Sequence, residues 1–189
     1  MCIDKFPFYR ENQEYWLLYD CETKQFYKYI IDNKFDIKKS IYLILTPFVL
    51  LFFNILSNVY DKLKTDSSNI FAMFLSALIS FIISYLLYKI SYKAELNKYN
   101  KSDLIVFEKS ELDNYMMLGK QQFYSILLPL IICSIIISIF MSIFYMVINS
   151  GLLFCLSFIM WFIFFLLFLV ASPFRRINFF KKYFKGELM

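Results

Sequence analysis

The chain has 189 residues, of which 60% are hydrophobic and 22% aromatic, and its formal net charge is +5. This composition excludes an ordinary soluble domain, because the apolar residues are gathered into long, nearly uncharged blocks. Histidine, the commonest general base and metal ligand, does not occur, and there are only three glycines for any phosphate-binding loop. We therefore expect no catalytic residue, no cofactor and no metal site.

Residues 1–40 are predicted to form a small cytosolic segment that contains a β-hairpin. The runs "EYWLLYD" and "QFYKYII" are rich in aromatic and β-branched residues, and "CETK" is a short polar connection between them. An isolated hairpin is marginally stable in water, so we expect a third strand from "DLIVFEK" at 103–109. The first 40 residues contain no apolar run that is long enough for a cleavable signal peptide.

Four blocks are long and apolar enough to cross a membrane, which takes about 20 residues in a helix. They are 41–60, 70–90, 124–148 and 152–172, and none of them contains Asp, Glu or Arg. The expected fold class is therefore an all-α membrane protein. It has a four-transmembrane-helix bundle over 41–172 and a small cytosolic β-hairpin or sheet element.

A cytosolic linker is expected at 91–123 and a basic cytosolic tail at 173–189. Within the linker, Ser110 followed by Asp113 resembles a capping box and predicts the start of a helix. That helix either runs into the third span or lies along the membrane interface before it.

The distribution of Lys and Arg predicts the orientation. The N-terminal segment, the 58–68 loop, the 89–120 segment, the 149–151 turn and the tail hold seven, two, six, none and five of them. Because these residues accumulate on the cytoplasmic side, we expect a multi-pass protein of the plasma membrane with both termini in the cytoplasm. The basic residues then face anionic lipid, so membrane lipid is an expected partner and nucleic acid is not.

Small residues recur at every fourth position in two of the spans, which places them on one helical face. Such stripes let helices approach closely in lipid. The favoured interpretation is that the two stripes pack on each other; the alternative is that one of them receives a helix of a partner. The two stripes consist of Ala72, Ser76, Ser80 and Ser84, and of Ser134, Ser138 and Ser142.

Further candidate contact residues lie in the first span and in the predicted external loop. They are Asn54, Asp61, Lys62, Lys64 and Asp66. Asn54 is more often an internal hydrogen-bonding residue than a contact site. Trp161 lies near the middle of the fourth span, where packing is the favoured role and its indole N–H requires an acceptor.

The order of these segments resembles a known family. An aromatic hairpin with "WLLYD", a Lys-rich linker "YKISYKAELNKYNKSDLIVFEKSELDN", two closely spaced spans and the tail "FRRINFFKKYFKG" are similar to the tandem five-transmembrane proteins of low-GC Gram-positive bacteria. Members usually have five spans, one more than expected here. Some look like immunity proteins against membrane-depolarising toxins that the type VII secretion system exports.

The resemblance implies an immunity protein that binds a secreted pore-forming toxin within the membrane, without catalysis. The alternative is an accessory membrane subunit of a transporter or sensor, which would use the cytosolic sheet as its contact surface. A channel-forming oligomer is a third possibility. No binding residue is carried over from the family, because no functional motif defines it.

Overall fold

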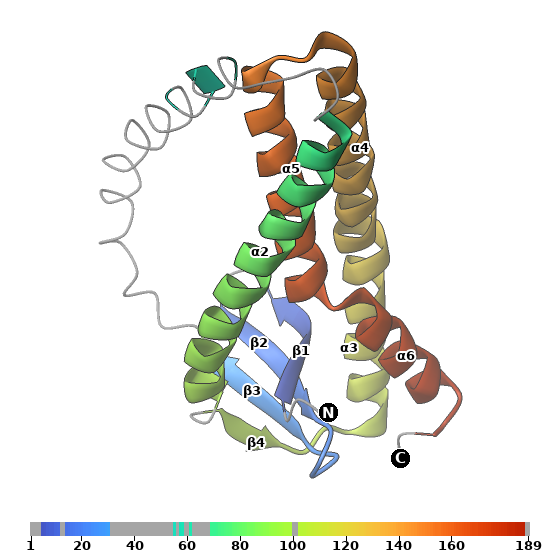
Figure 1. Cartoon of the computed structure of the whole chain (residues 1–189). Helices are drawn as coiled ribbons and strands as arrows, with labels where there is room; N and C mark the ends of the chain where they lie inside the picture. Colours follow the sequence, from blue (N-terminus) through green and yellow to red (C-terminus); the bar gives the residue numbers. More distant parts are fainter. Residues whose placement is uncertain are drawn as a thin grey trace. The chain divides into compact units, whose positions relative to one another are not determined.

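The computed structural model describes residues 5–11, 14–30, 55, 57, 58, 61, 69–99 and 102–187. The protein is mostly helical, with one small antiparallel sheet (Figure 1). Within the described residues, three helical stretches are long and apolar enough to cross a membrane: Ile70–Tyr92, Lys109–Ile148 and Gly151–Phe184. The first expected span, 41–60, lies almost entirely outside the described residues.

The chain divides into two compact units. The first unit combines residues 1–32, 89–130 and 171–189, and the second combines 33–88 and 131–170. The N-terminal segment, the linker and the tail, which were expected as separate parts, therefore contribute to one unit.

The first unit contains a four-stranded antiparallel sheet in the order β1-β2-β3-β4. The strands are β1 (Lys5–Glu11), β2 (Tyr15–Asp20), β3 (Phe26–Ile30) and β4 (Asp103–Ile105). The predicted hairpin is confirmed, because β2 pairs with β3 on either side of the "CETK" connection. The predicted third strand is also confirmed as β4, although it is shorter than the run 103–109. Strand β1 was not predicted.

Helix α3 (Lys109–Gln122) confirms the helix expected in the linker, but the predicted cap is wrong. The N-cap residue is Glu108, which makes no side-chain cap hydrogen bond, and Ser110 lies inside the helix. The Asp113 carboxylate instead accepts a hydrogen bond of 2.7 Å from the hydroxyl of Tyr183. Asp113, which its spacing from Ser110 assigned to the cap, is therefore paired with Tyr183, a residue from a distant segment of the chain.

Helix α3 runs without a break into α4 (Leu128–Ile148) through a π-helical turn, Phe123–Leu127. Of the two alternatives given for the linker helix, the observed one is therefore that it runs into the third span. Pro129 lies directly after the turn. A proline lacks the backbone N–H and crowds the preceding turn of the helix, and a π-helical turn is a common way to accommodate such a disruption.

Helix α2 (Asn69–Tyr99) extends further into the linker than expected, and helix α6 (Pro173–Phe184), which lies within the tail, was not predicted. Helix α5 (Gly151–Ala171) ends at Ser172, which adopts a left-handed conformation with φ 44°. Pro173 then starts α6 at a position where its missing N–H costs nothing. The Arg176 guanidinium donates 2.8 Å to the carbonyl oxygen of Ala171 and so satisfies the end of α5.

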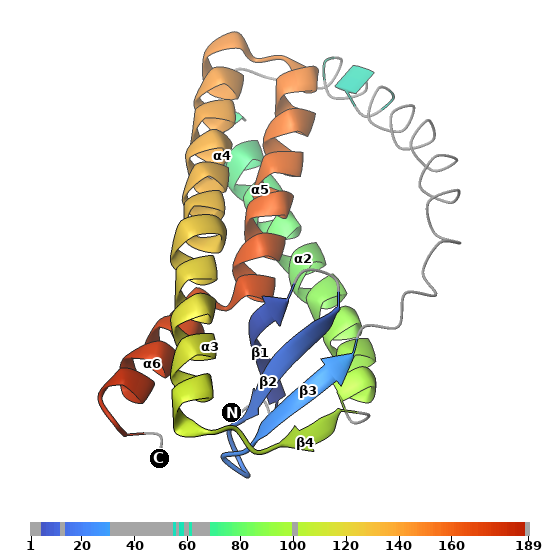
Figure 2. The ribbon, with the colours of Figure 1, turned by 180° about the vertical axis from the view of Figure 1, so that it is seen from behind.

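The core of the first unit is aromatic, and α3 and α6 supply one side of it (Figure 2). Gly119 of α3 lies so close to β1 that an added Cβ would stand 2.7 Å from the carbonyl oxygen of Phe8. Gln122 exchanges two hydrogen bonds with the backbone of Arg10 and so occupies part of the edge of β1. The most buried members of this core are Phe8, Leu17, Met116, Phe123 and Phe180.

Candidate functional site

The serine stripe of α2 faces α5. The hydroxyl of Ser80 donates a hydrogen bond of 3.1 Å to the carbonyl oxygen of Phe158. The hydroxyl of Ser84 donates one of the same length to the carbonyl oxygen of Phe162. Both partners advance by four residues, one helical turn, so α2 and α5 run parallel. Ser80 and Ser84 are fully buried. These residues act as donors to a neighbouring helix backbone.

The serine stripe of α4 also faces α5, on a different set of residues. The hydroxyls of Ser142 and Ser157 lie 2.9 Å apart, and the indole N–H of Trp161 donates 2.9 Å to the Ser142 oxygen. The Ser142 hydroxyl donates 2.8 Å to the carbonyl oxygen of Ser138. Because a hydroxyl has one proton and two acceptor positions, Ser157 must be the donor in its bond to Ser142, and Ser142 is then saturated.

The favoured expectation that the two stripes pack on each other is therefore corrected: the hydrogen bonds that leave each stripe go to α5. The reason is that α5 offers partners to both, with backbone carbonyl oxygens that accept from α2 and with the side chains of Ser157 and Trp161, which donate to Ser142 of α4. The requirement of Trp161 for an acceptor is met within the chain. Neither stripe is an open groove along these buried serines.

The remaining stripe residues bond to their own helices or carry no polar group. Ser76 donates to the carbonyl oxygen of Met73, and Ser134 to that of Ile131. The hydroxyl of Ser138 donates to the carbonyl oxygen of Ser134. Ala72 is half-buried near the start of α2. Serine back-bonding of this kind satisfies the hydroxyl without a partner helix.

Of the candidate residues outside the stripes, the structure describes Asp61. Its carboxylate accepts a 2.9 Å hydrogen bond from the backbone N–H of Gly151, the first residue of α5. An acid at this place satisfies a free donor and complements the positive end of the helix. Gly151 has no room for a side chain, because an added Cβ would collide with the carbonyl oxygen of Ser57. Asn54, Lys62, Lys64 and Asp66 lie outside the described residues.

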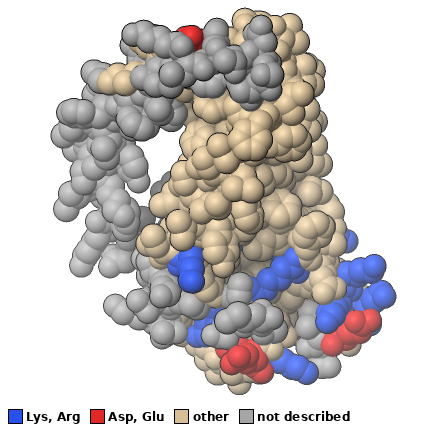
Figure 3. Space-filling view, viewed as in Figure 1, with Lys and Arg blue, Asp and Glu red and all other residues tan. Residues whose placement is uncertain are grey.

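The outward faces of the apolar helices are hydrophobic. Only 17% of the residues in the most apolar window of each helix are buried. Figure 3 shows mostly uncharged residues over these helices, and its Lys and Arg side chains are gathered at one end of the view. On α2, one exposed stripe lies about 200° around the helix from the buried serines. It consists of Phe74, Leu78, Ile82 and Leu86.

Nothing in the described part of the chain provides a metal-binding group of three or more His, Cys, Asp or Glu residues. Cys21, Cys133 and Cys155 do not form disulfide bonds. Comparison of the chain with protein-family models, curated proteins and solved structures finds no match. The functional inference therefore rests on the arrangement of the residues themselves.

Proposed function

We propose that this chain is a multi-pass protein of the bacterial plasma membrane that protects the cell from an exported, membrane-depolarising toxin by binding it within the bilayer. The proposal rests on one observation: the hydroxyls of the two serine stripes form hydrogen bonds inside the helical unit, while its outward faces are apolar. Such a unit can bind another helix through close van der Waals fit on its apolar surface. The described apolar helices of the second unit contain no Asp, Glu, Lys, Arg or His for a transport pathway.

The proposed contact surface is the exposed stripe of α2, Phe74, Leu78, Ile82 and Leu86. The serine stripes are unsuited to this role, because a partner would have to displace α5 from them. A toxin helix that packs along this stripe would be kept from other copies of itself, and so from assembling a pore.

The test is co-expression of the chain with exported proteins encoded by neighbouring genes as candidate toxins, with a voltage-sensitive dye as the readout. Protection should be lost in the variant Phe74→Ala/Leu78→Ala/Ile82→Ala. It should remain in the matched control Ile132→Ala/Ile136→Ala/Phe140→Ala, which removes similar exposed apolar area from α4. Equal depolarisation with and without the wild-type chain would reject the proposal.

The proposed orientation is tested separately. Single cysteines placed at residues 2, 66, 110, 150 and 187 of a cysteine-free variant would be labelled in intact cells with a membrane-impermeant maleimide. We expect labelling at 66 and 150 alone. Labelling at 2 or 187 would contradict cytoplasmic termini.

A second candidate, an accessory subunit that docks through its sheet, is favoured by the exposed apolar residues at edge strand β4. Leu104 is 53% exposed and Val106 is 89% exposed, and a hollow of about 220 Å³ lies beside them. Deletion of the N-terminal segment would destroy the core of the first unit, so Leu104→Lys/Val106→Lys is the sharper variant. Loss of protection in this variant alone would favour the sheet as the contact surface.

A further inference from the structure

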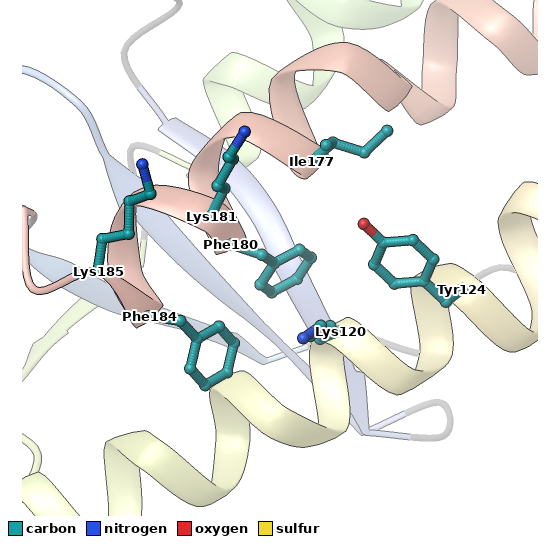
Figure 4. A pocket seen from close by; sticks show the side chains of 7 residues that line it. All are labelled: Lys120, Tyr124, Ile177, Phe180, Lys181, Phe184 and Lys185. Atoms are coloured by element: carbon teal, nitrogen blue, oxygen red, sulfur yellow. The ribbon is translucent and has the colours of Figure 1, made fainter.

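A hollow of about 310 Å³ lies between α3 and α6, within the first unit. Figure 4 shows the rings of Phe180 and Phe184 projecting from α6 toward α3, where Lys120 faces them. The Lys120 ammonium lies 4.8 Å from the centre of the Phe184 ring. A hollow of this size is at the lower end of those that hold small ligands.

The charged residues that line this hollow are all positive. Lys120 stands on one wall, Lys181 and Lys185 stand on the other, and no acid belongs to the lining. None of the three lysines forms an ion pair with another residue that the structure describes. In Figure 4 the side chains of Lys181 and Lys185 extend from α6 away from Lys120, and their flexible stems allow the ammonium groups to turn toward the hollow. The lining therefore suits an anion.

The other residues of the lining suit an apolar chain. Phe180 is 2% exposed and, with Ile177, forms an apolar floor. Tyr124 precedes the first residue of α4 by four positions, and Ile177 follows the last residue of α5 by six. The hollow is thus within two helical turns of both apolar helices, the level at which tyrosine and lipid headgroups meet.

We propose that this hollow binds an anionic phospholipid, with the headgroup phosphate at the three lysines and the start of an acyl chain on Phe180 and Ile177. A free phosphate would satisfy the lysines and leave the apolar floor without a function. A basic site that adjoins membrane-spanning helices on the cytoplasmic side is suited to lipid headgroups. The inference rests on the membrane location of the protein and is independent of toxin binding.

The experiment is native mass spectrometry of the full chain in detergent, titrated with phosphatidylglycerol or phosphatidylcholine. The variant Lys120→Gln/Lys181→Gln/Lys185→Gln should lower the affinity for phosphatidylglycerol by roughly a hundredfold, from the usual contribution of one lysine near anionic lipid. The charge-matched control Lys24→Gln/Lys109→Gln/Lys182→Gln removes three exposed lysines elsewhere in the same unit. It should retain wild-type affinity.

Two further arms identify the source of the phosphate. Millimolar inorganic phosphate at constant ionic strength, and the chain-free headgroup glycerophosphoglycerol, should each fail to displace the lipid. Displacement by either would overturn the lipid assignment in favour of a simple anion site. Equal loss of affinity in the two triple variants would overturn the site itself, because general attraction to the basic surface would then explain binding. A thermal unfolding midpoint equal to that of the wild type shows that each variant is folded.

Discussion

The two units of this chain bury opposite kinds of side chain. In the first unit, the interior is built from large rings and aliphatic groups such as Phe8, Phe180 and Met116. In the second, the most buried side chains include Ser80, Ser84 and Ser138, while Phe74 and its apolar neighbours face outward.

This contrast is the one expected if, as proposed, the second unit lies in lipid and the first in water. In water, removal of apolar surface drives packing, so rings go inside. In lipid, that driving force is absent, and close fit and interhelical hydrogen bonds take its place. The same residue types therefore have opposite roles in the two units, and substitutions in them should differ in cost by several-fold.

The largest effect is expected from Phe8→Ala in the first unit. Phe8 is 1% exposed and packs against Phe26 and Phe179, and removal of a buried ring costs about 3–5 kcal/mol. The chain has two tryptophans, one in each unit, so a Trp161→Phe background leaves Trp16 as the reporter of this unit. Its fluorescence during denaturant unfolding in micelles gives the free energy of unfolding.

The control for this prediction is Val106→Ala, because that side chain is 89% exposed. Its expected effect is within about 0.5 kcal/mol. If both variants unfolded at the same denaturant concentration, the aromatic cluster would not be the stabilising core of the unit.

Gly119→Ala is expected to have the next largest effect on the free energy of unfolding. Whether it stabilises or destabilises the first unit is informative. At an open position inside a helix, this change stabilises by about 1 kcal/mol. Here the new Cβ would stand 2.7 Å from the Phe8 carbonyl oxygen, so we expect a loss of about 1–3 kcal/mol. The Trp16 signal measures it, and a gain in stability would show that α3 does not approach β1 so closely.

Sequence patterns predicted the parts of the first unit that have a simple period. Strands β2 and β3 are rich in aromatic residues and flank a short polar turn, and they were found. Strand β1 was missed because Pro7 disfavours a strand, and because its register shifts between Pro7 and Tyr9, which breaks the two-residue period. Helix α6 was missed although Phe179 and Tyr183, both buried, have helical spacing.

In the second unit, the spacing of the serines predicted that they share a face but not which helix they meet. Close packing in lipid requires small residues, which is why the stripes were visible. The choice of α5 depends on the donor that Ser157 supplies and on the backbone acceptor at Phe158, which no pattern within α2 or α4 encodes. The basic hollow was not predicted either, because Lys120 and Lys181 come together only after α6 folds against α3.

A third effect should appear only in the first unit and only at high pH. Burial, with a hydrogen bond to Glu11, raises the pKa of Tyr9 to about 12; burial and the Tyr115 hydroxyl likewise raise the pKa of Tyr15. The unfolded chain loses these protons near pH 10, before the folded chain does. The stability they contribute is therefore complete below about pH 10 and is lost as the pH rises toward 12.

The measurement for this effect is the unfolding midpoint of the Trp16 signal across that range of pH, with Tyr9→Phe as the comparison. The variant has no phenol to ionise at this position, so its midpoint should fall less steeply. Identical slopes in the two proteins would mean that Tyr9 ionises as readily in the folded chain as in the unfolded one.

The smallest effects are expected in the second unit, and Ser142→Ala should have the larger of the two effects considered there. This change leaves the Trp161 indole N–H and the Ser157 hydroxyl without their acceptor. Hydrogen bonds between helices in lipid contribute about 0.6 kcal/mol on average, so two of them predict a loss of about 1–2 kcal/mol. Trp161 reports it in a Trp16→Phe background, through both its emission maximum and the unfolding midpoint.

Ser80→Ala is the matched comparison in the same unit. The carbonyl oxygen of Phe158, which accepts the Ser80 hydrogen bond, keeps its own bond within α5, so this substitution strands no group and should cost about 0.6 kcal/mol or less. Ser142→Ala should therefore cost more stability than Ser80→Ala, because two donors lose their acceptor in the first variant and none does in the second. The reverse order would mean that the fit of α2 against α5, and not the Ser142 hydrogen bonds, holds the helices of this unit together.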